Sequence, residues 1–183
     1  MKRWVFVLPV LGFLVVAGVL FKSLLLTPTQ VELPSVLIDK PAPPIALSPL
    51  DAGAKGFTRT DLAAGKVTVV NFFASWCAPC RLEADSLMFL SRSRGVTLYG
   101  VAYKDKPADT RQFLTETGDP FAAIVADREG SVAIDWGVTA APETFVIDGK
   151  GIIRFKYVGP LSADILAAVL MPQIRKAEAA SAS

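Results

Sequence analysis

The stretch VTVVNFFASWCAPC, residues 67–80, decides the fold of this chain of 183 residues. Its first half, Val67 to Phe73, is a near-continuous run of β-branched and aromatic residues, which is typical of a strand buried on both faces. Its second half opens a helix, because Pro79 is accepted in a first helical turn and Gly95 stands just past the predicted end near Ser93. The stretch therefore predicts a buried strand followed directly by a helix that begins at two cysteines.

Strand and helix patterns continue on both sides of this stretch. A short strand, a turn and a brief helix are predicted between Leu47 and Gly65. Downstream, we predict strands at 96–103, 121–126, 144–147 and 152–158, helices at 107–117 and 162–176, and a short helix or turn at 131–136. The last two strands are joined by Asp148-Gly149-Lys150-Gly151, a tight connection of the hairpin kind. Alternation followed by a hairpin predicts an α/β fold in which a mixed sheet carries helices on both faces.

The cysteine pair, Cys77 and Cys80, has the spacing and position of a thiol-disulfide exchange site. Exchange needs a thiolate that attacks and a second thiol that resolves the mixed disulfide. At a helix start, unpaired N–H groups and the positive end of the helix dipole favour the thiolate, so pKa values in such motifs fall from about 8.5 to about 3.5–7.5. We expect Cys77 to attack, and Cys80, one turn further in, to be less exposed and to resolve.

The composition excludes most other uses of these cysteines. The chain has no histidine and no third cysteine, which removes Ser-His and Cys-His catalysis, His-ligated haem and nearly all zinc sites. Covalent haem attachment would need His after Cys80, where Arg81 stands. A purely structural disulfide is an alternative, but closing so small a loop stabilises a fold little. We expect no metal, and no cofactor apart from a redox-active disulfide between Cys77 and Cys80.

The N-terminal segment predicts a membrane anchor. Lys2 and Arg3 precede an apolar run from Trp4 to Leu26, which is interrupted only by Lys22 and Ser23 near its end. About 20 apolar helical residues cross a bilayer, and the positive-inside bias keeps the N-terminus in the cytoplasm. The alternative is a cleaved secretory signal, but its apolar region is usually about 7–15 residues and precedes a small-x-small site, which is not found here. In a bacterium, the anchor would cross the inner membrane once and leave the domain in the periplasm.

Proline content and charge divide the rest of the chain. Six prolines between Thr27 and Pro49 discourage helix and predict an extended linker. Only three of the 19 basic residues and none of the 17 acidic ones fall in the anchor, so the exported part is nearly neutral and has no basic cluster for nucleic acid. We therefore expect an anchor at 1–26, a Pro-rich linker at 27–43, a globular domain at 44–176 and a flexible tail at 177–183.

Two motifs carry a family resemblance. Residues 70–83, VNFFASWCAPCRLE, resemble the active-site strand and helix of thioredoxin-like proteins. Gly137-Val138 followed by APETFVIDG, residues 141–149, resembles the cis-proline segment of the periplasmic cytochrome c biogenesis reductases of the CcmG or DsbE type. Tyr103-Lys104-Asp105 and the single N-terminal anchor resemble that family too. The resemblance runs from about Pro41 to Val169 and implies a thioredoxin-like fold for the domain.

The second motif implies the other wall of the site. Pro142 is implied to be a cis-proline that faces the cysteines, with the backbone of Ala141 able to pair with a substrate strand. The residues alone would favour an ordinary trans bond. Glu143 matches a family acid close to the active site.

The first motif implies further neighbours of the cysteines. Glu83 matches a second family acid, although a solvated helix residue explains it equally well. Asn71 stands where thioredoxin has a buried Asp, so a proton acceptor for Cys80 cannot sit there. We expect Trp76 to be a packing and docking surface beside Cys77 rather than a chemical participant.

The resemblance also implies a function. Reduced Cys77 would attack the C-x-x-C-H disulfide of an apocytochrome c, and haem attachment by the cytochrome c maturation machinery needs those thiols free. A membrane thiol-disulfide transporter of the DsbD or CcdA kind would recharge the oxidised protein. Strong periplasmic oxidants usually carry His between their cysteines, and Ala78-Pro79 lacks it, which favours a reductase.

Three alternatives to this function stay open at the level of sequence. A general or differently targeted reductase of the TlpA or ResA type would use the same cysteines. A non-catalytic module that holds apocytochrome would not need them. A thioredoxin-type peroxidase would need a catalytic Thr four residues before its cysteine, where Phe73 stands.

Overall fold

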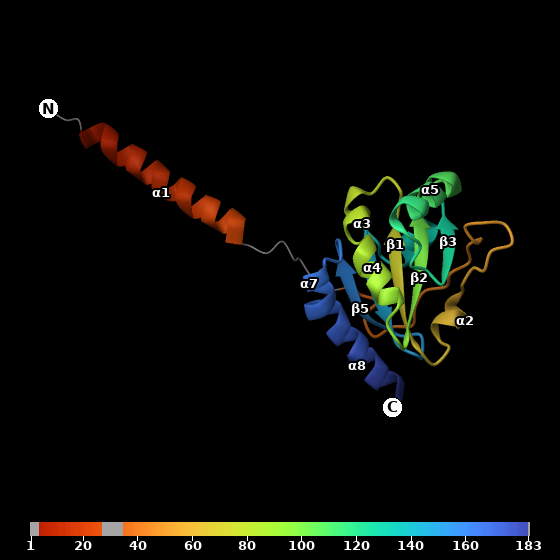
Figure 1. The fold of residues 1–183 in the computed structure, drawn as a ribbon. Coiled ribbons are helices and arrows are strands. Elements are labelled where there is room, and N and C mark those ends of the chain that lie inside the picture. Colours follow the sequence, from red (N-terminus) through yellow and green to blue (C-terminus); the bar gives the residue numbers. More distant parts are fainter. Residues whose placement is uncertain (1–3, 27–34, 183) are drawn as a thin grey trace. The chain divides into compact units, whose positions relative to one another are not determined.

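The computed structural model describes residues 4–26 and 35–182. By its internal contacts the chain divides into two compact units, residues 1–33 and 34–183. Figure 1 shows the described part of the first unit as a single helix, and the second unit as a sheet flanked by helices.

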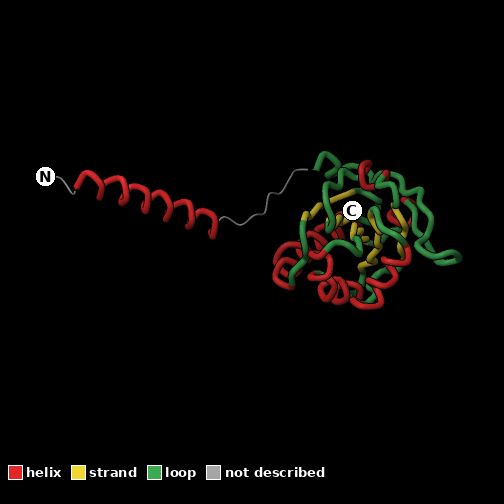
Figure 2. The backbone as a smooth tube through the Cα atoms, turned by 90° about the horizontal axis from the view of Figure 1, so that it is seen from above, coloured by secondary structure: helices red, strands yellow, loops and turns green. Residues whose placement is uncertain are grey.

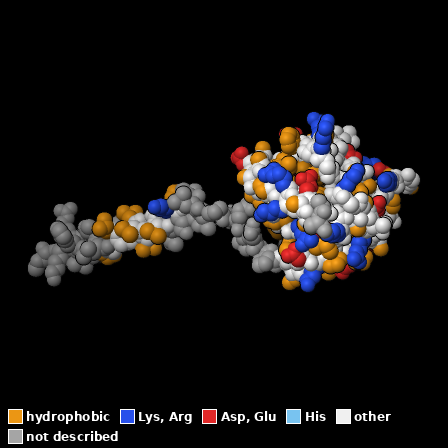
Figure 3. Space-filling model, turned by 90° about the horizontal axis from the view of Figure 1, so that it is seen from below, with side chains coloured by type: hydrophobic (Ala, Val, Ile, Leu, Met, Phe, Trp, Pro, Cys, Tyr) orange, Lys and Arg blue, Asp and Glu red, His pale blue; other side chains and the backbone are white. Residues whose placement is uncertain are grey.

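The N-terminal unit contains one described helix, α1 (Trp4–Leu26), which covers the run predicted as the anchor. Several of its apolar side chains are exposed, from 58% for Leu11 to 71% for Phe13, and Figure 3 shows them on its surface. Among the residues that the structure describes, no helix meets the length and apolarity required for crossing a membrane. Residues 27–34, the first part of the predicted linker, lie outside the described residues.

From residue 67 onward the second unit alternates strands and helices in the predicted order, but the short strand predicted between Leu47 and Gly65 is not formed, and Pro49 makes only an isolated bridge with Val125. Its strands are β1 (Val67–Phe73), β2 (Val96–Tyr103), β3 (Ala123–Asp127), β4 (Glu143–Ile147) and β5 (Ile153–Val158). Its helical segments are α2 (Arg59–Leu62), α3 (Ala78–Leu82), α4 (Ala84–Ser91), α5 (Pro107–Thr117), α6 (Ser131–Asp135), α7 (Ala163–Ile165), the π-helical η1 (Leu166–Leu170) and α8 (Met171–Ala182).

The five strands form one mixed sheet in the order β3-β2-β1-β4-β5. β1 lies at the centre, parallel to β2 and antiparallel to β4, and β5 pairs with β4 as the predicted hairpin. Every residue of β1 is buried, which confirms the prediction of a strand covered on both faces. This central strand leads into the cysteines, so the best-buried element of the fold positions the site.

Helices cover both faces of the sheet, as predicted. Side chains alternate between the faces along β1. Val69 packs with apolar residues of α4, η1 and α8, whereas Val70 packs with residues of α2 and α6. α5 packs beside Phe73 at the end of the strand that leads to the cysteines. Figure 2 shows the strands between a side rich in helix and a side where loop predominates.

The closing helix is longer than predicted. We expected it to end near Lys176, but α8 continues to Ala182. Ala177 is fully buried, and the Ser181 hydroxyl accepts a hydrogen bond of 2.7 Å from the backbone N–H of Gly149. Residues 177–182, predicted as a tail, are therefore helical because they pack against the β4–β5 hairpin.

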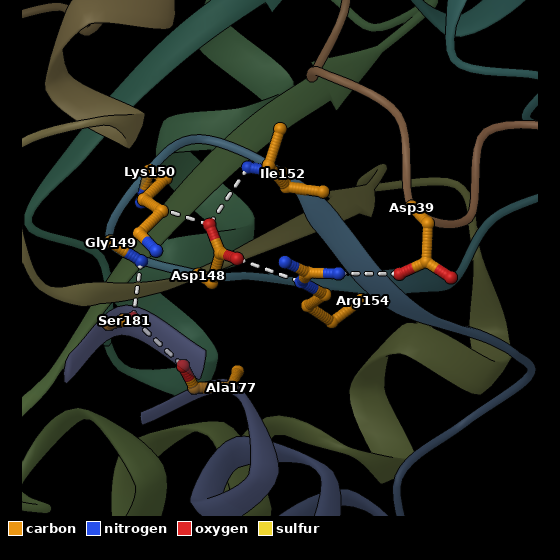
Figure 4. A network of polar contacts seen from close by, with 8 residues as sticks. All are labelled: Asp39, Asp148, Gly149, Lys150, Ile152, Arg154, Ala177 and Ser181. Carbon is orange, nitrogen blue, oxygen red and sulfur yellow. Dashed lines mark hydrogen bonds and ion pairs between the residues drawn. The ribbon is translucent and has the colours of Figure 1, made fainter. Parts of the chain in front are cut away.

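Part of the predicted linker belongs to the domain. The backbone N–H of Asp39 donates to the carbonyl of Ile153 (2.8 Å), and that of Ile153 donates to the carbonyl of Lys40 (2.9 Å), along the outer edge of β5. Figure 4 shows Arg154 between two carboxylates, with Nη1 2.6 Å from Asp39 Oδ1 and Nε 2.7 Å from Asp148 Oδ2. The compact unit therefore starts before the predicted boundary at residue 44.

The same segment continues to the opposite edge of the sheet. The backbone N–H of Leu50 donates to the carbonyl of Ile124, and the N–H of Ala126 donates to the carbonyl of Ser48, both at 3.0 Å. These bonds lie along the outer edge of β3. Residues 39–50 thus supply backbone partners at both edges of the sheet.

Candidate active site

Cys77 and Cys80 form a disulfide at the start of α3, with a sulfur–sulfur distance of 2.05 Å. Cys77 is the N-cap residue, and its Sγ accepts a hydrogen bond of 3.2 Å from the backbone N–H of Cys80. Pro79 fits the first turn because a backbone donor is not needed there. Both cysteines are buried in this oxidised form, with Cys77 3% and Cys80 1% exposed, so the expected difference in exposure is small.

Asp105 connects the loop before the cysteines to the loop after β2 through hydrogen bonds. Its Oδ2 accepts from the backbone N–H of Ser75 (2.6 Å), and its Oδ1 accepts from the Ser75 hydroxyl (2.8 Å). The Thr110 hydroxyl and the N–H of Lys106 supply two further donors to this buried carboxylate. Sequence reasoning noted Asp105 only within a family motif and gave it no role, because nothing local indicates its contact with a residue 30 positions earlier.

Trp76 lies on the surface next to this buried network. Its Nε1 donates to the carbonyl of Lys104 at 3.2 Å, and its ring centroid is 6.3 Å from that of Tyr103. The residue is nevertheless 58% exposed. An oriented and exposed indole next to Cys77 has the properties expected of a docking surface.

Glu83 is buried at the junction of α3 and α4. The helix predicted over 78–93 is interrupted there, and the reading of Glu83 as a solvated residue is wrong, since it is 0% exposed. Its Oε1 accepts from Asn71 Nδ2 at 3.0 Å, and its Oε2 accepts from the backbone N–H of Leu161 at 3.1 Å. These partners lie in β1 and just before α7, so long-range contacts explain why Glu83 turns inward.

The electrostatic setting of Glu83 favours its neutral form. Burial raises the pKa of the carboxyl to about 7 from an ordinary 4.5, and the hydrogen bonds from Leu161 and Asn71 oppose that rise only in part. A cavity of about 10 Å³, the space that one water molecule needs, is lined by Glu83, Cys80 and mainly apolar side chains. A carboxyl that titrates near neutral pH therefore shares a cavity with the second cysteine.

The Ala141–Pro142 peptide bond is cis, as the family resemblance implies. Ala141 packs against the apolar cluster that contains both cysteines, so this loop forms another wall of the site. Ala141 stays partly exposed, whereas Pro142 is buried.

Glu143 lies under this wall and is also fully buried. Its Oε1 accepts from the backbone N–H of Thr139 (2.8 Å), from the Thr139 hydroxyl (2.7 Å) and from the N–H of Ala140 (3.2 Å). Its Oε2 lies 2.8 Å from Nζ of Lys156 in an ion pair. Sequence reasoning missed Lys156, since its place in β5 does not indicate which residue of β4 it meets.

Together these contacts define what the site can do. A disulfide at a helix N-terminus supplies the sulfur chemistry of thiol-disulfide exchange. An exposed indole, a titratable buried acid and a loop with a cis-proline lie around it. Within the described ranges, no three His, Cys, Asp or Glu side chains gather where they could hold a metal ion. The fold and site define a thiol-disulfide oxidoreductase of the thioredoxin-like class.

The comparisons with known proteins narrow this class. Residues 38–170 match the family model described as Redoxin. The chain is 41% identical over 164 residues to the thiol:disulfide interchange protein DsbE of Allochromatium vinosum, covering 90% of this chain and 89% of the relative. It is 44% identical over 140 residues to the thiol:disulfide interchange protein HelX of Rhodobacter capsulatus, covering 76% and 78%. The chain belongs to the redoxin family and, within it, to the DsbE-type thiol:disulfide interchange proteins.

Solved structures agree with this assignment. The crystal structure of a thiol:disulfide interchange protein DsbE from Chlorobium tepidum superposes with a TM-score of 0.65 and 28% identity, over 79% of this chain and 99% of the other. The fold is therefore thioredoxin-like, as predicted.

Proposed function

We propose that this chain is a membrane-anchored periplasmic disulfide reductase that reduces the C-x-x-C-H disulfide of apocytochrome c before haem attachment. The observation that carries the proposal is the pairing of the Cys77–Cys80 disulfide with the buried Glu83 on one short helical segment. Such a pair supplies both the sulfur chemistry and a group for the accompanying proton. The similarity to DsbE and HelX proteins and the motif of residues 137–149 favour the cytochrome substrate.

The reaction has two steps. The Cys77 thiolate attacks one sulfur of the substrate disulfide, so a bond forms between Cys77 and that sulfur while the other substrate sulfur leaves as a thiolate and takes a proton. The Cys80 thiolate then attacks Cys77, which breaks the mixed disulfide and releases the second substrate thiol. The protein dithiol loses two electrons and the substrate disulfide gains them.

Glu83 accepts the proton of Cys80 in the second step. Asn71 cannot serve as a base, but its amide donates to Glu83 and so holds the carboxyl in its buried position, where Glu83 and Cys80 line the same small cavity. A carboxyl with a pKa of about 7 is well matched to proton transfer near neutral pH.

The site-shaping residues bind the substrate. The backbone of Ala141 pairs with an extended segment of the apocytochrome, next to the cis-proline, and the exposed ring of Trp76 provides an apolar contact surface. Glu143 holds the loop that precedes Ala141 in place.

The N-terminal unit anchors the protein to the inner membrane with the domain in the periplasm. The exposed apolar side chains of α1, and the basic residues Lys2 and Arg3 before it, support this placement. A DsbD- or CcdA-type transporter in the same membrane recharges the oxidised protein, and the cytochrome c maturation machinery receives the reduced substrate. Carbonate extraction of membranes, with intact-mass measurement of the extracted chain, tests the anchor, and release of a shortened chain would contradict it.

A trapped intermediate tests the substrate. Cys80→Ala removes the resolving thiol, so the variant should accumulate a mixed disulfide between Cys77 and its substrate, which mass spectrometry identifies. We expect C-x-x-C-H peptides of c-type cytochromes among the trapped partners, and the Cys77→Ser/Cys80→Ala double variant serves as the control. Recovery of small thiols alone would contradict a dedicated cytochrome role.

The reduction potential tests the direction of electron transfer. Equilibration of the Cys77–Cys80 pair with glutathione should give a potential far more reducing than the about −120 mV of a strong periplasmic oxidant. A value near that of the oxidant would overturn the reductase assignment.

A further inference from the structure

Lys156, the ion-pair partner of Glu143, takes no part in the reaction steps described above. It lies in the middle of β5, directly opposite Phe145 of β4, and its side chain is only 6% exposed. Its Nζ is 2.8 Å from Glu143 Oε2, donates to the carbonyl of Gly137 at 2.7 Å, and lies 5.4 Å from the centroid of the Phe145 ring. An ammonium group that is buried this deeply needs such partners, because burial without them is costly.

The contacts of Lys156 converge on one short loop. Gly137 begins the loop, and Glu143, on the far side of it, binds the N–H groups of Thr139 and Ala140 through its other oxygen. The loop itself is largely exposed and leads directly into Ala141 and the cis-proline. Lys156 therefore holds the loop twice, through the Gly137 carbonyl and through the carboxylate of Glu143.

The negative charge of Glu143 explains why a cation lies at this position. Glu143 is fully buried, and an uncompensated carboxylate in that position would gain by turning to solvent. If it turned, the N–H groups of Thr139 and Ala140 would lose their acceptor, and the backbone before Ala141 would lose its fixed position. The ammonium group removes that tendency without taking the oxygen that binds the loop.

We propose that Lys156 is a positioning residue for substrate binding: it compensates the charge of Glu143 and so holds residues 137–140, from which the backbone of Ala141 meets an extended substrate. This inference rests on the proposed function, because it concerns how the same site receives a polypeptide disulfide. Lys156 does not touch the reacting sulfurs, so its loss should weaken the binding of peptides and leave the intrinsic reactivity of Cys77 nearly unchanged.

The test compares a peptide disulfide with a small one. The reduced full-length protein and its Lys156→Met, Lys156→Arg and Lys150→Met variants are assayed with an oxidised C-x-x-C-H peptide and with hydroxyethyl disulfide, which is too small to need the wall. For Lys156→Met we expect KM for the peptide to rise by about tenfold, while kcat and the rate with hydroxyethyl disulfide stay within about twofold. Lys156→Arg should restore most of the peptide affinity, since it keeps the charge. Lys150→Met, which removes an exposed lysine at the tip of the same hairpin, should match the wild type.

Other outcomes are decisive as well. An unchanged KM for Lys156→Met, or an equal loss with both disulfides, would overturn the positioning role. If Lys156→Met fails to fold, the Glu143→Leu/Lys156→Met double variant leaves no unpaired buried charge and also removes the acceptor of the loop N–H groups. It should show at least the same rise in KM, whereas a wild-type KM would overturn the inference. Failure of the proposed function gives a different result, because the wild type would then bind the C-x-x-C-H peptide no better than a disulfide peptide of scrambled sequence.

Discussion

Glu83, which shares a small cavity with Cys80, and Glu143, which binds the loop before the cis-proline, are both fully buried, but the protein holds them in opposite ways. Glu143 is paired with the ammonium group of Lys156 and accepts three hydrogen bonds from the loop before the cis-proline. Glu83 accepts two hydrogen bonds and has no ion pair with any described residue. Burial alone therefore does not decide what an acid does. A carboxylate whose charge is balanced by a lysine can hold a loop in place, whereas a carboxyl without an ion pair can bind and release a proton.

Removal of the Lys156 ammonium group should have the largest effect on the free energy of unfolding. Lys156→Met leaves Glu143 buried without its partner, so we expect the free energy of unfolding to fall by about 4 kcal/mol at pH 7. Chemical denaturation followed by circular dichroism measures it. Glu143→Gln/Lys156→Met, which removes both charges, should lose much less. An equal loss in the double variant would show that the ion pair itself, rather than the unpaired charge, provides the stability.

The pH dependence of the free energy of unfolding should show the raised pKa of Glu83. The Glu83 carboxyl keeps its proton up to about pH 7 in the folded oxidised protein, but only to about its ordinary 4.5 in the unfolded chain. Between these values the folded state binds more protons, so the contribution of Glu83 to the free energy of unfolding falls as pH rises, by about 3 kcal/mol in all. Unfolding of the wild type and Glu83→Gln from pH 4 to 8 measures this as a difference between the two curves. Parallel curves would contradict the raised pKa.

Asn71→Asp tests the surroundings of Glu83 directly. Asn71 Nδ2 donates to Glu83 and to the Thr144 hydroxyl, and the substitution replaces this donor with a second acid. We expect a loss of about 2 kcal/mol at pH 8, when both carboxyls tend to ionise, and a smaller loss at pH 5, when one proton can be shared between them. Denaturation at the two pH values checks this, and a loss independent of pH would indicate a packing effect instead.

An exposed ion pair supplies the smallest expected effect. Arg111 of α5 pairs with Asp51, and both side chains are about half exposed, at 53% and 45%. Arg111→Gln should change the free energy of unfolding by less than about 1 kcal/mol, because solvent screens such pairs. The same denaturation assay tests it. A loss as large as that of Lys156→Met would contradict the view that burial sets the value of these charges.

Local signals explain what could be predicted from the sequence. The apolar run of β1 and the C-x-x-C at the start of α3 specify the central strand and the disulfide, because both depend on residues close together in the chain. The cis bond before Pro142 and the nearby acids came only from the family resemblance, since X-Pro sequences are far more often trans.

Long-range contacts explain what could not be predicted. Glu83 looks like a helix-surface residue until Asn71 and Leu161 are brought to it, from 12 and 78 residues away in the chain. Lys156 is one of several charges in a hairpin, and only the strand register places it over Phe145. The prolines before residue 44 predict an extended linker, but residues 36–39 form a turn, and nothing in the local sequence indicates that Asp39 and Lys40 pair with Ile153 of β5.

The segment from Asp39 to Leu50 has a consequence for self-association. An open sheet has two edge strands, whose free N–H and C=O groups are templates for pairing with another chain and for aggregation. Here one short piece of backbone occupies part of both edges, along β5 through Asp39 and Lys40 and along β3 through Ser48 and Leu50. Along the part that this segment covers, neither edge offers free backbone groups to another copy of the protein.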